Sequence, residues 1–162
     1  MSALVWRDGK NPEVLLVCGL GSGFLPKAPG TWGSVLGLAV WWWLLAPLPW
    51  LLQLAVAAAT FAVGWWLVQR VTRRYECHDD PAIVIDEIVG IWIALLGIGE
   101  SWMLAGLGFV LFRFLDIVKP WPIGVADRNV PGGLGVMLDD LIAGVLVAIV
   151  LHVSVFVFAQ VF

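Results

Sequence analysis

The stretch DPAIVIDEIVGIWIALLGI, residues 80–98, decides the fold of this chain. It opens with an Asp-Pro pair, which is typical of a helix start, and it stays apolar for about the length of a bilayer crossing. Two carboxylates, Asp86 and Glu87, lie about 8 Å along it. Because hydrocarbon penalises an unpaired carboxylate by roughly a few kcal/mol or more, the stretch predicts a membrane helix whose acids are held by something cationic.

The rest of the chain has the same apolar character. Its 162 residues are 61% hydrophobic and 13% charged, and the mean hydropathy is +0.96. Soluble domains contain about 25% charged residues. Further apolar segments at about 31–46, 51–69, 102–118 and 136–162 are expected to be helices. The sequence therefore predicts an all-α, polytopic membrane bundle of about five apolar helices, with residues 1–162 forming a single integral membrane domain.

A Gly/Pro-rich loop is expected near the N-terminus. Residues 19–34 contain five Gly and two Pro, a composition that does not form a regular spanning helix. The helix that follows has about 14 residues when counted from position 33, and it covers only about 21 Å of a hydrocarbon core about 30 Å thick. It is expected to be half-buried or to cross a thinned membrane.

The charges predict the orientation in the membrane. All nine Lys and Arg residues lie in three segments separated by pairs of crossings: Arg7, Lys10 and Lys27; Arg70, Arg73 and Arg74; Arg113, Lys119 and Arg128. By the positive-inside rule these segments are cytoplasmic, with the N-terminus inside and the C-terminus outside. Glu100 is the single charged side chain expected on the far side. With 12 acidic and nine basic residues, the chain has no basic face for nucleic acid.

Candidate groups for binding an anion lie at the cytoplasmic face. Three predicted helices begin there, so their N-termini favour an anion such as phosphate. Arg113, Asp116 and Lys119 are spaced i, i+3, i+6 and are expected to line the same cavity. Further candidates for substrate contact lie in the loops, although loop entry and helix capping explain most of them almost as well: Lys27, Thr31, Ser34 and Arg128.

Four carboxylates form the candidate metal site: Asp86, Glu87, Asp139 and Asp140. Oxygen ligands without nearby His or Cys favour Mg²⁺ over zinc. Adjacent helix positions differ by about 100° in direction, so one member of each pair can bind metal while the other pairs with Arg or Lys. The sequence leaves open which member does so. It also leaves open a purely structural role, in which these acids pair internally with basic residues. His78 is interpreted as an interfacial residue, and Asp79 and Asp80 as a solvated loop charge and a helix N-cap.

Four blocks of sequence resemble one known family. They are residues 29–34 (PGTWGS), 83–90 (IVIDEIVG) followed by Trp92, 112–123 (FRFLDIVKPWPI), and 127–140 (DRNVPGGLGVMLDD) with Ala143 and Gly144. In this order they resemble the phosphatidylglycerophosphatase A family of membrane phosphatases. Pro131 and Ile85 depart from the pattern, but neither departure removes a carboxylate.

The resemblance implies Mg²⁺-dependent hydrolysis of phosphatidylglycerophosphate to phosphatidylglycerol and inorganic phosphate, at the cytoplasmic face of the bacterial inner membrane. On this hypothesis the four carboxylates hold one or two Mg²⁺ ions, and Arg113 and Lys119 neutralise phosphoryl charge. Asp116 orients the attacking water or adds a metal ligand. An aspartyl-phosphate route stays open.

Two other functions fit the sequence less well. A cation or lipid transporter would use the acidic residues as a permeation site, but such a site lies near the membrane midplane, whereas these acids cluster at one face. A membrane phosphotransferase acting on nucleotide-activated lipid would need a spaced Asp signature that the sequence lacks.

Overall fold

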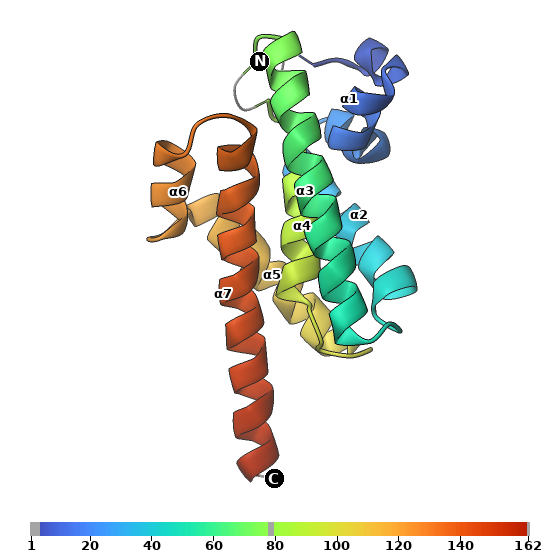
Figure 1. Ribbon diagram of the computed structural model, residues 1–162. Helices are drawn as coiled ribbons and strands as arrows, with labels where there is room; N and C mark the ends of the chain where they lie inside the picture. The colour runs from blue at the N-terminus through green and yellow to red at the C-terminus, as the bar shows by residue number, and fades with distance from the viewer. Residues whose placement is uncertain (1–3, 78–79, 162) are drawn as a thin grey trace.

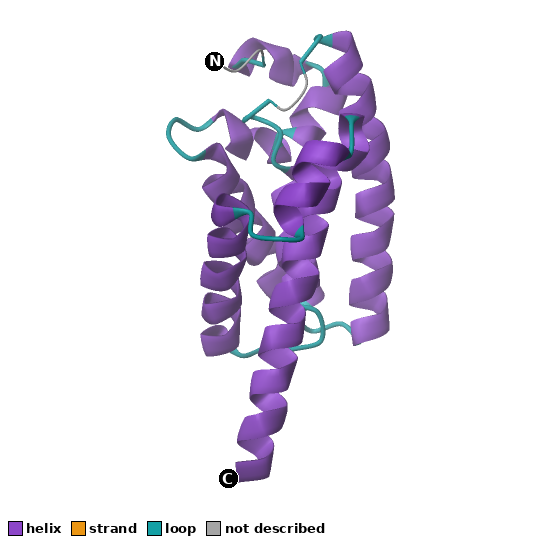
Figure 2. Cartoon of the chain, turned by 90° about the vertical axis from the view of Figure 1, so that its left-hand side faces the viewer, coloured by secondary structure: helices purple, strands orange, loops and turns teal. Residues whose placement is uncertain are grey.

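The computed structural model describes residues 4–77 and 80–161, and every regular element in these ranges is helical (Figures 1 and 2). This confirms the all-α prediction. His78 and Asp79 lie outside the described residues. The long elements are α2 (Pro29–Val40), α3 (Trp50–Arg74), α4 (Ile85–Ala94), α5 (Trp102–Val118) and α7 (Gly132–Val161). The short ones are η1 (Trp6–Lys10), α1 (Pro12–Val17), η2 (Gly19–Phe24), η3 (Trp41–Leu45) and α6 (Ile123–Asn129).

Helix α4 is the centre of the bundle and packs against α7, α2, α3 and α5. Its contact with α7 is close because both helices carry glycine where they meet. A Cβ added to Gly144 would overlap the carbonyl oxygen of Gly90, and one added to Gly90 would lie 3.0 Å from the carbonyl oxygen of Asp140 on α7. Small residues that let helix backbones approach are typical of membrane bundles. Helix α7 continues past the ends of the other helices towards the C-terminus (Figures 1 and 2).

The start of α4 corrects the sequence prediction. The helix expected over residues 80–98 begins at Ile85 and ends at Ala94, so Asp80 and Pro81 do not start it. The Asp80 carboxylate instead accepts hydrogen bonds from the backbone N–H groups of Leu4 (3.0 Å) and Ala82 (2.9 Å). The Val84 N–H donates to the Val17 carbonyl at 2.9 Å. Residues 80–84 therefore dock on the N-terminal segment, because the bonds made there replace those of a first helical turn.

The other helix boundaries agree with the sequence prediction only in part. Helix α5 has the predicted bounds, 102–118. Helix α2 starts at Pro29 and continues through the π-helical turn η3, whereas α3 extends to Arg74, beyond the predicted end. The segment 119–135 was predicted to be a loop but contains α6 and the start of α7, and the expected N-terminal loop contains η2. Within η2, Gly19 and Gly21 have φ of 55° and 99°, as a tight turn requires.

Two described helices are long and apolar enough to cross a membrane, α3 and the Gly132–Gln160 part of α7. Only 28% and 22% of their most apolar windows are buried inside the protein, so most of their apolar side chains face outward. A core helix of a soluble protein would be mostly buried. Helices α2, α4 and α5 are shorter than these two. The number of about five crossings therefore stays a prediction.

Candidate active site

A cavity of about 350 Å³ lies where α2, α4 and α7 begin and α5 ends. Seven of the described residues that line it are acidic: Asp80, Asp86, Glu87, Asp116, Asp127, Asp139 and Asp140. Two are basic, Arg113 and Lys119. Three helix N-termini thus meet at one cavity, as the sequence predicted. The excess of acids makes the cavity suited to a cation, and a phosphate group would need that cation to enter.

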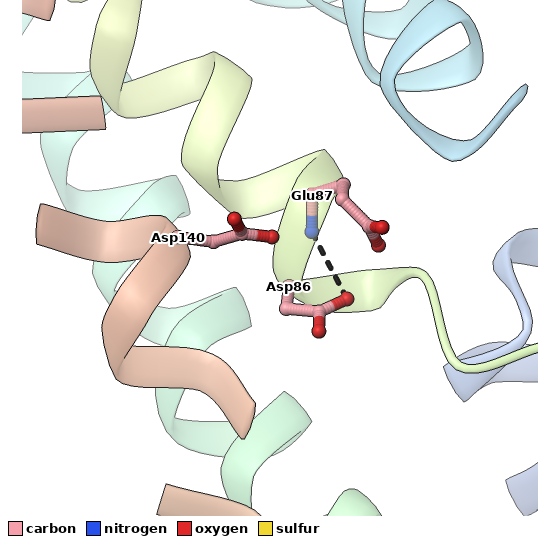
Figure 3. A group of neighbouring side chains, drawn as sticks. All are labelled: Asp86, Glu87 and Asp140. Atoms are coloured by element: carbon pink, nitrogen blue, oxygen red, sulfur yellow. Dashed lines mark hydrogen bonds between the residues drawn. The ribbon is translucent and has the colours of Figure 1, made fainter. Parts of the chain in front are cut away.

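The carboxylates gather in two overlapping groups of three. In the first, oxygens of Asp86, Glu87 and Asp140 lie within 4.8 Å of one another. Figure 3 shows Asp86 and Glu87 in the first turn of α4, with Asp140 reaching towards them from α7. The second group joins Asp140 with Asp116 and Asp139 at the same spacing. Asp140 therefore belongs to both groups, and α4 and α7 bring together residues that are more than fifty positions apart.

The oxygen atoms of this cluster fit a divalent cation. Glu87 Oε2, Asp139 Oδ1 and Asp140 Oδ1 are buried and have no hydrogen-bond partner among the described residues. A buried carboxylate oxygen without a partner costs free energy, which a bound cation would offset. The ligand atoms of both groups are carboxylate oxygens, the donors that hard cations prefer. The cluster is therefore compatible with a divalent metal.

Arg113 connects the acidic cluster to α2. Its Nη1 lies 2.6 Å from Asp116 Oδ2 and 3.8 Å from Glu87 Oε1. The same atom donates to Ser34 Oγ at 3.3 Å, while the Ser34 hydroxyl donates to the Gly30 carbonyl at 2.9 Å. All three contacts are made by Nη1, so they hold this end of the guanidinium beside the two carboxylates. Arg113 is thereby aimed between Glu87 and Asp116 at the cavity wall.

Lys119 binds two acids from the other side. It is the C-cap of α5, with a left-handed φ of 46°, and its Nζ lies 2.6 Å from Asp127 Oδ1 and 2.7 Å from Asp139 Oδ2. Burial by itself lowers the pKa of Lys119, but the hydrogen bonds to Asp127 and Asp139 outweigh it and raise the pKa above its ordinary value. Lys119 is therefore positively charged at neutral pH.

Internal pairing accounts for only part of the acidic cluster. Arg113 and Lys119 pair with Asp116, Asp127 and Asp139, and Arg113 is also near Glu87. Within the described ranges, no Lys or Arg forms an ion pair with Asp86 or Asp140, although these residues are only 8% and 3% exposed. The purely structural reading therefore leaves two buried carboxylates without a cation.

The residues predicted to contact substrate lie outside the lining of the cavity. Ser34 is fully buried behind Arg113, whereas Lys27 and Arg128 are exposed and Thr31 is half-buried. Whether Lys27, Thr31 and Arg128 contact a substrate stays a prediction. Sequence reasoning did not select Asp127 for the site, and it interpreted Asp80 as a helix cap. The i, i+8 spacing of Lys119 and Asp127 does not predict their contact unless the turn into α6 is known.

The structure thus combines an acidic cavity that is compatible with a divalent cation with two helices long and apolar enough to cross a membrane, which defines the class as a helical protein of membrane character. The sequence model of the family described as "Phosphatidylglycerophosphatase A" matches residues 15–155. The chain belongs to the phosphatidylglycerophosphatase A family.

Named relatives agree with this assignment. The chain is 43% identical to the Phosphatidylglycerophosphatase A of Escherichia coli (strain K12), over 88% of this chain and 83% of the relative. It is 42% identical to the protein of the same name from Haemophilus influenzae, over 86% of each. A Bacteroides thetaiotaomicron relative, 40% identical over 87% of this chain and 92% of its own, is provisionally named a phosphatidylinositol-3-phosphatase. No solved structure matches significantly.

Proposed function

We propose that this chain hydrolyses the phosphomonoester of phosphatidylglycerophosphate, releasing phosphatidylglycerol and inorganic phosphate, and that Mg²⁺ is its cofactor. One observation carries the proposal: a member of this family has two clusters of three carboxylates, and Asp140 belongs to both clusters. A lipid phosphatase has to bring a dianionic phosphate to its acidic site, and metal ions together with Arg and Lys supply the charge that makes this possible.

Asp86, Glu87, Asp139 and Asp140 would hold the metal. Bound Mg²⁺ would supply Lewis acidity towards the phosphate oxygens and lower the pKa of a nearby water. Asp116 is the candidate for orienting that water, because it lines the cavity and belongs to the second cluster of carboxylates, with Asp139 and Asp140. As the water oxygen bonds to phosphorus, the bond between phosphorus and the glycerol oxygen breaks. One proton of the water passes to the leaving alcohol, and the other stays on the released phosphate.

Arg113 and Lys119 would neutralise phosphoryl charge that grows in the transition state. Both line the cavity and both are held by carboxylates, so their positions are set before substrate arrives. Ser34 would act by holding Arg113 rather than by touching substrate. An aspartyl-phosphate intermediate is the competing route. Trapping a phosphorylated protein would favour it over direct attack by water.

The chain would be a single domain that crosses the bacterial inner membrane about five times, with its cavity facing the cytoplasm. Support comes from the charges, because the nine Lys and Arg residues lie in three segments that the positive-inside rule assigns to the cytoplasm, and two of them, Arg113 and Lys119, line the cavity. The substrate would then enter from the inner leaflet. A transporter is disfavoured, because its acidic residues would lie near the membrane midplane.

The range of substrates needs its own comparison. One relative is provisionally named for a different lipid phosphomonoester, so a phosphoinositide monoester is a second candidate substrate. Both lipids present the same phosphate monoester to the cavity and differ in the alcohol that leaves. A comparison of kcat/KM for the two decides between them, and we expect the value to be higher for phosphatidylglycerophosphate.

The decisive experiment measures phosphate release by purified protein in detergent micelles. We expect activity with Mg²⁺, loss of activity with chelator, and a fall of roughly 100-fold or more in Asp86→Asn and Asp140→Asn. Mg²⁺ should also raise the melting temperature of the parent but not of Asp140→Asn, because an ion that binds the folded state stabilises it. Glu100→Gln, at the far end, is the matched control. Activity indifferent to chelator and to both substitutions would contradict the metal site.

A further inference from the structure

An apolar groove lies directly beside the acidic cavity. It has a volume of about 260 Å³, and its walls include Leu4, Trp6, Phe24 and Leu25. Pro29 and Pro81 belong to the walls of both the groove and the cavity. The cavity and the groove therefore share one wall. Carboxylates, Arg113 and Lys119 line the cavity, whereas mostly apolar side chains line the groove.

The groove is held in a fixed position relative to the cavity. Asp80 lines the cavity, and its carboxylate binds the N–H of Leu4, a groove residue, at 3.0 Å. Gly23 approaches the Ala82 backbone so closely that an added Cβ would overlap the Ala82 carbonyl oxygen. Residues 80–84 thus carry the groove wall and lead directly into α4 with its metal-site acids.

One short loop runs along the boundary between the two compartments. Leu25 lines the groove, Ala28 lines the cavity, and Pro29 lines both. Lys27 lies between them, exposed, and the backbone at Lys27 and Ala28 is left-handed, with φ of 62° and 51°. Non-glycine residues rarely adopt this conformation, and here it occurs at two successive positions. Lys27 therefore lies in a loop whose neighbouring residues line both compartments.

We propose that the groove binds the glycerol esters and the first methylene groups of the acyl chains of the lipid substrate, while the phosphomonoester occupies the acidic cavity and Lys27 lies at the phosphodiester between them. The inference rests on the proposed function and adds the site that recognises the lipid. The substrate has the same order of parts, with a terminal phosphate, a glycerol, an anionic phosphodiester and then hydrocarbon. An apolar groove, a boundary cation and an acidic metal site match that order.

Leu25→Trp is the sharpest test, because it fills the groove without removing a packing contact from the core. We expect KM for phosphatidylglycerophosphate to rise about 10-fold or more, while kcat/KM for glycerol 3-phosphate, which has no hydrocarbon, stays within about twofold. Lys27→Gln should raise KM for phosphatidylglycerophosphate but not for phosphatidic acid, which has no phosphodiester in its head group. Trp43→Gln changes an aromatic side chain that is exposed but does not line the groove, and it should leave KM unchanged for both substrates.

A photoreactive group on the acyl chain near its ester tests occupancy without relying on turnover. If the acyl chain enters the groove, the photoreactive group should label residues 4–25, and Leu25→Trp should reduce that labelling. Labelling confined to α2 and α5 would show that the hydrocarbon stays among bulk lipid, and would overturn the proposal. Full hydrolysis by Leu25→Trp with an unchanged KM would also overturn it and leave the proposed function intact. Labelling of the groove without phosphate release by the parent would instead overturn the function.

Discussion

At the scale of single residues, Lys119 holds two acids that would otherwise repel each other. Lys119→Met should lower the free energy of unfolding by about 1–3 kcal/mol, because the Asp139 side chain is 7% exposed and would lose its cation. Adding Asp139→Asn to Lys119→Met should cost less than the sum of the two single changes, since the pair is removed together. Thermal unfolding in detergent with chelator measures both effects, and strictly additive changes would contradict the pairing.

Cys18 gives a pH-dependent test of the N-terminal packing. The thiol is fully buried at the end of α1, and burial, followed by the charges of Asp80 and Asp8, raises its pKa to about 12. Because the folded pKa lies above the unfolded value of about 8.5, the thiol stays protonated at pH 8 and its contribution to stability is lost as pH rises towards 12. A maleimide at pH 8 should modify Cys18 far more slowly in folded protein than in unfolded protein.

The maleimide experiment uses a Cys77→Ser background so that Cys18 is the single thiol followed. The same protein unfolded in sodium dodecyl sulfate serves as the control for intrinsic reactivity. Rapid modification of the folded protein would show that the packing of α1 and η2 over Cys18 opens readily.

At the scale of elements, the first turn of α2 has to pass close to the acidic cluster. A Cβ on Gly30 would overlap Glu87 Oε1 and would lie 3.3 Å from Arg113 Nη1. Gly30→Ala should therefore displace Glu87 and reduce kcat by roughly 100-fold with little loss of folded protein, because small misplacements of catalytic groups are costly. Phosphate release and circular dichroism measure the two effects. Gly106→Ala in α5 is the control, since an added Cβ there meets nothing within 4 Å.

Helix positions also show how far sequence alone could predict this site. The apolar runs and paired acids predicted that Asp86, Glu87, Asp139 and Asp140 would meet, because acids in apolar helices need a shared partner. The Arg113, Asp116 and Lys119 spacing placed all three at the cavity. The roles of these residues remain predictions.

The features that sequence reasoning missed depend on contacts between distant segments. Asp80 was expected to cap a helix, but its carboxylate binds the backbone of Leu4, 76 positions away. Asp127 reaches Lys119 because the chain turns after α5 and forms α6, in a segment whose Gly and Pro content indicated a loop. Local propensity could not predict either contact, because each is decided by tertiary packing.

At the scale of the whole molecule, the proposed orientation predicts which residues meet each side of the membrane. On a Cys77→Ser background, Glu100→Cys should react with a membrane-impermeant maleimide added outside intact spheroplasts. Arg74→Cys should react only after permeabilisation, because the cavity end is proposed to face the cytoplasm. Cys18 is buried, so the Cys77→Ser protein without a new cysteine gives the background labelling. Labelling of both new cysteines from outside would contradict the orientation.

Asp140 belongs to both clusters of three carboxylates, and this has a genetic consequence. Loss of Asp86 or Asp116 disrupts one group and leaves the other with its three oxygens, whereas loss of Asp140 disrupts both. In a library of all single substitutions selected for growth that depends on this enzyme, position 140 should accept the fewest replacements. Even Glu should fail there, because an added methylene would move the carboxylate out of the position from which it joins both groups.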